Sequence, residues 1–370
     1  NLHDVGSYTI YFDYIRLEKK LRPDFLYLFD FGAEDSPVYP GFTQILPNTT
    51  YSLAKGYGFK NISSRGENRK NPNDLFCDWV LLDSANNEFM VDLPNGEYKV
   101  HLMIEDPGYW EYYQNWTSRK VIAEGQTKIE ETMNSDTFFN DYYFKHLDTE
   151  DLPGMDVFDT YIKPRYIFKT FEVNVSDGQL NLSAYPYWAY AAPFSCLIIY
   201  SKEESAEGDM WLSGFWQELH DEFVNRIIEY PYDETNSPAV FTQEDIEKGY
   251  TIFVRDYWDT VYSNSIPIAQ EIRNTISVTA AFNEYEPFPF SVYPHKDLGL
   301  SVVTISDMID GDGHLISKDN VEINVVQYKL SRLGGGGDCY GYKILPRLLR
   351  KKDKVEIKKG VDRTFWLTIK

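Results

Sequence analysis

The segment from Asp106 to Trp116, DPGYWEYYQNW, carries the residue types best suited to binding chemistry. It places five large aromatic residues within eight positions, directly after an alternating run typical of a β-strand. Aromatic faces stack on sugar rings, and carboxylates accept hydrogen bonds from sugar hydroxyls. We therefore predict a carbohydrate-binding loop whose stacking residues are Tyr109, Trp110, Tyr112 and Trp116. Its predicted hydroxyl acceptors are Glu105, Asp106 and Glu111.

A second aromatic cluster, Tyr187, Trp188 and Tyr190, precedes the apolar run Phe194–Tyr200. Its composition predicts the same stacking chemistry, because loops at the ends of β-sandwiches commonly carry recognition. The alternative for both clusters is structural: the rings would close the end of a sandwich or pack on a second domain.

Few side chains are spaced for catalysis. The six histidines form no pair with zinc-ligand spacing, and no G-x-S-x-G nucleophile turn occurs. Glu284 and Glu286 are the best carboxylate pair, and on a strand they would share one face about 7 Å apart. That distance lies between those of retaining and inverting glycosidases. Two glutamates on an exposed strand face are common, so we assign no catalytic residue to this chain.

Metal and thiol chemistry are weakly indicated. Asp310 and Asp312 supply oxygen ligands in a tight turn but lack the remaining spacing of a calcium loop, so a plain hairpin turn is predicted. Three cysteines exclude a disulfide framework. Cys77 and Cys196 fit either a single bridge or two buried thiols. We predict no cofactor.

The charge of −21 over 370 residues disfavours nucleic acid and anionic lipid as partners. The basic run from Arg347 to Lys359 alternates with apolar residues, which predicts a solvated strand edge. No run of about 18 apolar residues is present, so we expect no membrane span.

Five N-x-S/T sequons lie within the first 181 residues. They make these asparagines candidates for N-glycosylation: Asn48, Asn61, Asn115, Asn174 and Asn181. Clustered sequons favour an extracellular or cell-surface location.

Short alternating runs separated by turn residues predict an all-β chain. Candidate strands in the first half are Phe25–Phe31, Phe76–Leu82, Glu88–Leu93, Tyr98–Glu105, Lys120–Glu124, Ile167–Val175, Gln179–Ala184 and Phe194–Tyr200. Those in the second half are Tyr250–Arg255, Ile276–Phe282, Phe288–Val292, Val302–Ser306, Val321–Tyr328 and Thr364–Ile369. The turns at Pro94–Gly96 and Asp177–Gly178 predict antiparallel hairpins. Three prolines around Phe288–Val292 predict an edge strand.

One helix interrupts the β pattern. Apolar residues recur every three or four positions from Gly208 to Tyr230, with Asp209 as the expected cap and Pro231 as the stop. Thr242 opens a capping box for one further helical turn. We predict an N-terminal extension over residues 1–24, a β-sandwich over 25–203, a helical connector over 204–248 and a second sandwich over 249–370.

Several spaced blocks in the first sandwich carry a family resemblance. They are Phe29–Gly32, Ser36–Val38, Pro40–Phe42, Tyr51–Phe59 and Leu93–Val100. Residues 25–200 resemble the galactose-binding-like domain of rhamnogalacturonan acetylesterase-type enzymes. The resemblance implies a jelly-roll sandwich in a polysaccharide context. It also implies a structural calcium, which the sequence does not locate.

The second half resembles the non-catalytic region that precedes the barrel in large secreted glycoside-hydrolase-like proteins. The blocks that carry this resemblance are Gly249–Asp256, Asn283–Pro287, Phe290–Pro294, Asp297–Gly299, Pro346–Arg350 and Arg363–Leu367. In such proteins a catalytic (β/α) barrel follows, whereas this sequence ends at Lys370. The family's catalytic residues therefore have no counterpart in it.

Together these patterns predict a non-catalytic carbohydrate-binding accessory region of an extracellular polysaccharide-active protein, with a glycan as partner. One alternative is a glycosylated subunit that self-assembles into a cell-surface layer or extracellular filament. The other is a glycoside hydrolase that uses Glu284 or Glu286.

Overall fold

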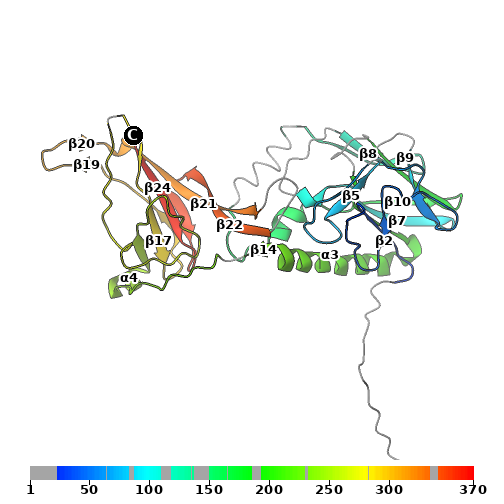
Figure 1. Ribbon diagram of the computed structural model, residues 1–370, viewed down its shortest axis with the longest axis horizontal. Helices are drawn as coiled ribbons and strands as arrows, with labels where there is room; N and C mark the ends of the chain where they lie inside the picture. The colour runs from blue at the N-terminus through cyan, green and yellow to red at the C-terminus, as the bar shows by residue number, and fades with distance from the viewer. Residues whose placement is uncertain are drawn as a thin grey trace, which may run out of the picture.

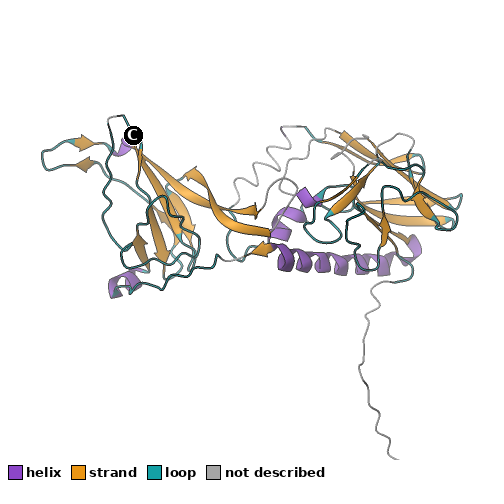
Figure 2. Ribbon diagram, in the orientation of Figure 1, coloured by secondary structure: helices purple, strands orange, loops and turns teal. Residues whose placement is uncertain are grey.

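The computed structural model describes residues 23–63, 65–82, 87–109, 118–134, 136, 150–164, 166–185, 193–229, 232–281, 283–333 and 341–370. It shows two β-rich lobes side by side along the longest axis, with one long helix under the first lobe (Figure 1). Strands dominate both lobes (Figure 2). The predicted all-β architecture is confirmed.

The first lobe is a sandwich of two five-stranded sheets. One sheet, here called the helix-covered sheet, has the order β10 (Lys169–Val175), β7 (Gly96–Met103), β13 (Cys196–Ser201), β1 (Tyr27–Phe31) and β2 (Thr43–Ile45). The facing sheet has the order β3 (Tyr57–Phe59), β6 (Phe89–Asp92), β11 (Gln179–Tyr185), β8 (Ser118–Ala123) and β9 (Gln126–Thr132). A small third sheet joins β12 (Pro193–Phe194), β5 (Asp78–Leu81) and β4 (Gly66–Asn68).

Apolar side chains at alternate positions fill the space between the two large sheets. Leu180, Leu182 and Ala184 of β11 point inward and are buried, as the period of two along a strand requires. Phe31 and Phe89 meet edge to face across the sandwich, with ring centroids 4.9 Å apart. Each fully buried side chain of this kind contributes about 1.5–3 kcal/mol of hydrophobic free energy.

The two predicted hairpins are wrong. The turn at Pro94–Gly96 joins β6 to β7, and the turn at Asp177–Gly178 joins β10 to β11, but each connects strands of opposite sheets. β6 pairs with β11, and β7 pairs with β10, so the two turns lie together at one end of the sandwich. Leu93 N donates to Gly178 O at 3.0 Å between them. Turn residues specify a chain reversal, whereas the core decides which sheet receives the next strand.

The long helix α3 (Ser205–Ile227) covers the outer face of the helix-covered sheet. Phe215, Leu219 and Phe223 are buried there, which confirms the predicted apolar face. β13 is buried on both faces as a result. Gly208 permits this contact, because a Cβ at that position would lie 2.5 Å from the Tyr200 ring.

The predicted cap of this helix is wrong. The helix begins at Ser205, after the 3₁₀ turn η4 (Lys202–Glu204), so Asp209 lies inside it. The Asp209 carboxylate instead accepts from Lys99 Nζ at 2.7 Å and from the Tyr200 hydroxyl at 2.7 Å. Tertiary partners on the sheet thus take the carboxylate that the local pattern had assigned to capping.

The second lobe is built on a sheet ordered β14 (Ile228–Glu229), β22 (Gly341–Lys351), β21 (Val321–Leu333), β24 (Arg363–Ile369), β17 (Phe290–Pro294) and β15 (Tyr250–Phe253), with β16 (Glu286–Pro287) on β24. Two small antiparallel pairs accompany it: β18 (Gly299–Val302) with β23 (Lys354–Ile357), and β19 (Met308–Ile309) with β20 (Leu315–Ile316). The short helix α4 (Gln243–Lys248) begins at the predicted cap, where Thr242 Oγ1 accepts from Asp245 N at 3.1 Å.

Several expectations for this lobe fail. β17 lies between β24 and β15 and is not an edge strand, because its prolines fall at or outside the paired residues. Residues 276–281 form no strand. The segment alternates as a strand does, but only Ile276 is half-buried and residues 277–281 are exposed, so neither face of it is covered. The basic run forms the end of β22 and β23, and beyond Lys343 β22 is the edge of its sheet.

The β21–β22 ribbon fastens the two lobes together (Figure 1). Tyr342 is buried in the same cluster as α3, and Leu330 packs against that cluster. Asp151 of the first half accepts from Leu330 N at 2.7 Å, and its own amide donates to Tyr328 O at 3.1 Å. An ion pair between the buried Arg363 and the half-buried Glu150 closes the same junction. The predicted boundaries at residues 24, 203 and 248 stay predictions.

Candidate functional site

The structure places part of the predicted binding loop. Tyr109 ends the 3₁₀ turn η1 (Pro107–Tyr109), which follows β7. The other predicted stacking residues and acceptors lie outside the described residues: Trp110, Glu111, Tyr112, Trp116, Tyr187, Trp188 and Tyr190. Their roles stay predictions. The structure shows the residues around the base of this loop, here called the rim: Arg69, Glu105, Asp106, Gly108, Arg119 and Arg332.

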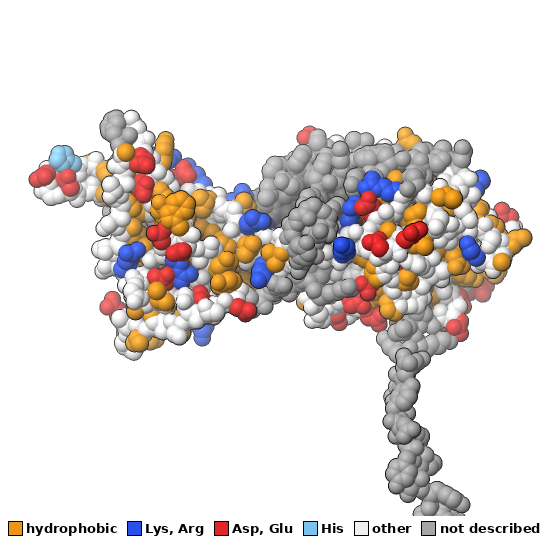
Figure 3. Space-filling view, viewed as in Figure 1, with side chains coloured by type: hydrophobic (Ala, Val, Ile, Leu, Met, Phe, Trp, Pro, Cys, Tyr) orange, Lys and Arg blue, Asp and Glu red, His pale blue; other side chains and the backbone are white. Residues whose placement is uncertain are grey.

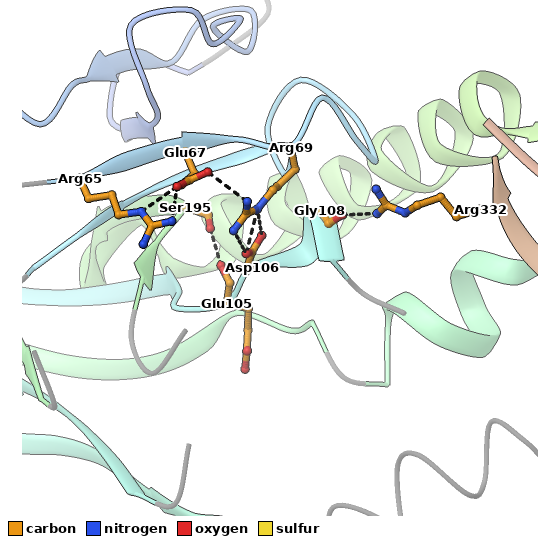
Figure 4. Close-up of polar contacts among 8 residues, drawn as sticks. All are labelled: Arg65, Glu67, Arg69, Glu105, Asp106, Gly108, Ser195 and Arg332. Atoms are coloured by element: carbon orange, nitrogen blue, oxygen red, sulfur yellow. Dashed lines mark hydrogen bonds and ion pairs between the residues drawn. The ribbon is translucent and has the colours of Figure 1, made fainter. Parts of the chain in front are cut away.

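Asp106 is the buried centre of this rim (Figure 4). Arg69, just after β4, donates to Asp106 Oδ2 from Nη2 at 2.9 Å and from Nε at 3.1 Å. Burial raises the pKa of the Asp106 carboxyl, and the Arg69 charge opposes that shift. A two-pronged guanidinium–carboxylate contact holds both groups in one geometry.

Glu67 of β4 extends the pair into a short network. Its carboxylate accepts from Arg69 Nη1 at 3.0 Å and from Arg65 Nε at 2.7 Å. The two guanidinium carbons lie 5.7 Å (Arg65) and 5.5 Å (Arg69) from the centroid of the buried Trp79 ring. Two guanidinium groups therefore lie over one fully buried aromatic ring of β5.

Glu105 pairs with a different arginine. Arg119 of β8 is buried, forms an ion pair with Glu105 and donates from Nη1 to Ile104 O at 3.0 Å. Its Nε also donates to Glu131 Oε2 at 2.6 Å. Burial alone lowers the pKa of the Arg119 guanidinium, but the two glutamates raise it above its ordinary value. Attraction to Arg119 in turn lowers the pKa of Glu131 despite its partial burial.

The carboxylates of Glu105 and Asp106 are thus engaged by arginines, with side-chain exposures of 5% and 1%. In this geometry they brace the start of the predicted loop. Their predicted role as sugar hydroxyl acceptors stays a prediction. Ser195 Oγ adds a hydrogen bond to Glu105 O at 2.6 Å.

The second lobe reaches the same rim. Arg332 of β21 donates from Nη2 to the backbone carbonyl of Gly108 at 2.7 Å (Figure 4). Gly108 is required at this point, because a Cβ there would lie 2.3 Å from the Arg69 side chain. The turn that leads into the aromatic segment is therefore held by residues from β4 and β21.

Arg69, Arg119 and Arg332 were missed by sequence reasoning. For Arg119 a signal exists: it shares the inward phase of β8 with Val121 and Ala123, and all three are buried. A charged residue in phase with core residues predicts a buried partner of opposite charge. The contacts of Arg69 with Asp106 and of Arg332 with Gly108 join segments far apart in the sequence, and no local pattern marks them.

The remaining candidates are dispersed. Glu284 Oε2 accepts from Ala281 N at 2.6 Å within a turn, and Glu286 begins β16. Asp310 and Asp312 lie in the β19–β20 hairpin, as predicted, with His314 close enough to form an exposed three-ligand group. Cys77 and Cys196 are buried thiols, and Cys339 lies outside the described residues.

Comparison with known proteins finds a family match within the first lobe. Residues 27–111 match the family described as beta-agarase/YXIM esterase-like, galactose-binding domain-like. The predicted resemblance of the first half to a galactose-binding-like domain is thereby confirmed. The rim around Asp106 lies at the C-terminal end of the matched residues.

Two curated proteins are similar to part of the chain. Beta-agarase A of Zobellia galactanivorans is 27% identical over 155 residues, which are 42% of this chain and 22% of that protein. The uncharacterized esterase YxiM of Bacillus subtilis is 28% identical over 163 residues, 42% of this chain and 31% of that protein. The chain thus matches less than a third of the length of either relative.

The crystal structure of the Bacillus subtilis YxiM protein is 26% identical, covering 48% of this chain and 40% of that one, with a TM-score of 0.33. Within the described part of the chain, no helix is long and apolar enough to cross a membrane.

Proposed function

We propose that this chain is a non-catalytic carbohydrate-binding region of an extracellular, polysaccharide-active protein. The observation that carries the proposal is the match of residues 27–111 to a galactose-binding domain-like family. One similar protein is a beta-agarase, which makes a galactose-containing polysaccharide the first ligand to test. Because the relatives are matched only in part, their activities are not transferred.

The rim geometry supports this proposal. The aromatic segment that we expect to stack on sugar starts at Tyr109, and the preceding residues are held by Arg69, Arg119 and Arg332. A loop whose base is fixed loses less conformational entropy on binding than one that must first be ordered. Buried ion pairs at the base therefore favour binding by the loop.

Exposure of the sequon asparagines supports an extracellular location. Asn48, Asn61 and Asn174 are exposed, and Asn181 is half-buried on β11. Asn115 lies outside the described residues. Glycans at the exposed positions would project from the first lobe without displacing its core. The charge of −21 also favours a neutral glycan over a polyanion as the ligand.

The experiment is retardation of the purified chain in native gels cast with agarose, galactan and pectic polysaccharides. A Trp110→Ala/Trp116→Ala variant tests the predicted loop, and Tyr285→Ala, an exposed aromatic in the second lobe, is the matched control. We expect one polymer to retard the wild type and Tyr285→Ala but not the double variant.

Absence of retardation by every polymer would overturn the proposal. If the chain then sedimented as large regular assemblies, the structural alternative, a subunit of a surface layer or filament, would replace it.

A further inference from the structure

A groove of about 290 Å³ opens on the second lobe, far in the sequence from the predicted loop. One wall is the segment from Arg255 to Val261, which follows β15, and the other is β22 from Pro346 to Leu349. Residues of β17 and β24 lie between these walls. Its size is near the lower end of pockets that bind small ligands.

The first wall carries exposed aromatic side chains. Trp258, beside the groove, is 81% exposed, and the lining residue Tyr257 is 41% exposed. The two rings are tilted with centroids 4.9 Å apart, and Tyr257 meets the half-buried Trp366 ring edge-on at 6.3 Å. Three aromatic rings thus form a continuous ridge. A tryptophan this exposed gains little burial energy from the fold, so its large apolar surface is available to a ligand.

The segment that bears the ridge is anchored at its first residue, Arg255. Arg255 donates to Glu271 from Nε at 2.6 Å and from Nη2 at 3.1 Å. It also donates to the carbonyl oxygens of Thr260 and Ile266, both at 3.3 Å. The guanidinium therefore ties both ends of the loop to one carboxylate. A loop fastened in this way presents its aromatic side chains in a fixed arrangement.

The turn itself orients Trp258. Asp256 Oδ1 accepts from Trp258 N at 3.0 Å, and Asp256 O accepts from Asp259 N at 2.8 Å. Aspartate side chains commonly stabilise such turns. These bonds fix the backbone turn that carries Trp258, and the Tyr257 ring lies beside its ring.

Polar groups alternate with apolar ones around the groove. Ser291 and Thr364 share a buried hydrogen bond of 2.8 Å, while Asp256, Asp259 and Thr260 are exposed along one wall. Pro346 and the half-exposed Leu349 give the opposite wall an apolar edge, with Arg347 between them in sequence. Figure 3 shows the same mixture of exposed hydrophobic and charged side chains over the second lobe.

We propose that this groove is a second saccharide-binding site of the chain. Sugar rings have apolar faces that stack on aromatic side chains, and hydroxyls that bind carboxylates, hydroxyl groups and arginine. The ridge and the polar walls supply both kinds of contact. An interface with a second copy would favour a drier surface, since the centres of such interfaces are depleted of charged residues. The location of the site follows from the groove, and its ligand class rests on the proposed function.

The test uses the same polysaccharide gels, and it compares apparent dissociation constants of the wild type, Trp258→Ala and Tyr285→Ala. Tyr285 is a matched control because it is an aromatic residue of the same lobe, 65% exposed and outside the groove. We expect Trp258→Ala to weaken binding of at least one polymer roughly tenfold or more, as truncation of an aromatic anchor does. Trp258→Tyr, which keeps a stacking ring, should recover most of that loss.

Each other result has a distinct meaning. Loss of binding in Trp110→Ala/Trp116→Ala but not in Trp258→Ala keeps the proposed function and overturns the second site. Loss in Trp258→Ala alone keeps the second site and moves binding away from the first lobe. A wild type that no polymer retards overturns both. A concentration-dependent dimer that Trp258→Ala abolishes in sedimentation overturns the saccharide assignment in favour of a second copy of the chain.

Discussion

In both the rim of the first lobe and the groove of the second lobe, an arginine holds the backbone in place. The rim charges are buried, whereas the groove is open to solvent. In the rim, Arg119 is 2% exposed and pairs with Glu105, which is 5% exposed, so the charges are sealed inside. In the groove, Arg255 is 10% exposed and pairs with Glu271 at the base of a loop whose outer side carries Trp258. Both arginines fix backbone, but only the second stands behind a described open aromatic surface.

This difference separates two roles of a buried ion pair. Taking charges out of water is costly, and the cost is offset only when the partner and further hydrogen bonds are in place. At the rim the ion pairs are part of the core, so their loss should lower the free energy of unfolding. At the groove the ion pair shapes a surface loop, so its loss should mainly weaken polysaccharide binding. Substitutions at the two places can therefore be told apart.

Replacement of Arg119 should have the largest effect on stability. Arg119→Met leaves the buried Glu105 carboxylate without its guanidinium partner, and removal of one member of a buried pair costs about 3–5 kcal/mol. Chemical denaturation, followed by tryptophan fluorescence, measures the loss in free energy of unfolding.

The control for Arg119 lies next to it on β8. Lys120 pairs with Glu130 at the surface, with exposures of 39% and 56%, so Lys120→Met should cost less than about 1 kcal/mol. Equal effects of the two variants would mean that the rim is no more structural than the surface, and the contrast between the lobes would fail.

A titratable group buried in the first lobe should make its stability depend on pH. His101 of β7 is 3% exposed, and its Nε2 and Nδ1 lie 2.8 Å from the Tyr200 and Thr170 hydroxyls. Burial lowers the pKa of His101 to about 4, from 6.5 when unfolded. The neutral ring therefore contributes fully above pH 6.5, and this contribution is lost as pH falls toward 4. The loss is up to about 3 kcal/mol.

The contribution of His101 to the pH dependence is obtained as the difference between the wild type and a variant without the histidine. Unfolding of the wild type and of His101→Gln is compared at pH 7 and pH 4.5, so that carboxylates common to both cancel. The wild type should lose more stability than the variant. Parallel losses in wild type and His101→Gln would contradict the assignment.

Replacement of Arg255 should have an intermediate effect on stability and a large one on binding. Arg255→Met removes the charge-assisted hydrogen bonds to Glu271 and to the loop backbone. Because Glu271 is 14% exposed and water can reach it, the total loss in free energy of unfolding should be about 1.5–3 kcal/mol. The groove wall would lose its anchor, so polysaccharide retardation should weaken even though no ring is removed. Unchanged retardation with a lowered unfolding free energy would show that the loop holds its shape without Arg255.

Period-two patterns were enough to predict most strands of the first lobe and the apolar face of α3, because both follow from local burial. The sheet that each strand joins was not predictable in this way. The turn at Asp177–Gly178 has hairpin residues, yet β11 pairs with β6 and β8 in the opposite sheet. Arg69 was missed for the same reason, since Arg69 and Asp106 are 37 positions apart and meet only after folding. Loop anchors such as Arg255 carry no periodic signal at all.

The smallest effect on stability should come from Trp258, and this makes it the sharpest test of the contrast. Because the ring is 81% exposed, Trp258→Ala should change the free energy of unfolding by no more than about 0.5 kcal/mol. The two variants would then separate stability from binding: Arg119→Met unfolds more easily, and Trp258→Ala loses binding without unfolding. A loss of several kcal/mol in Trp258→Ala would show that the ridge packs the second lobe, and the groove would then be a by-product of folding rather than a surface kept for a ligand.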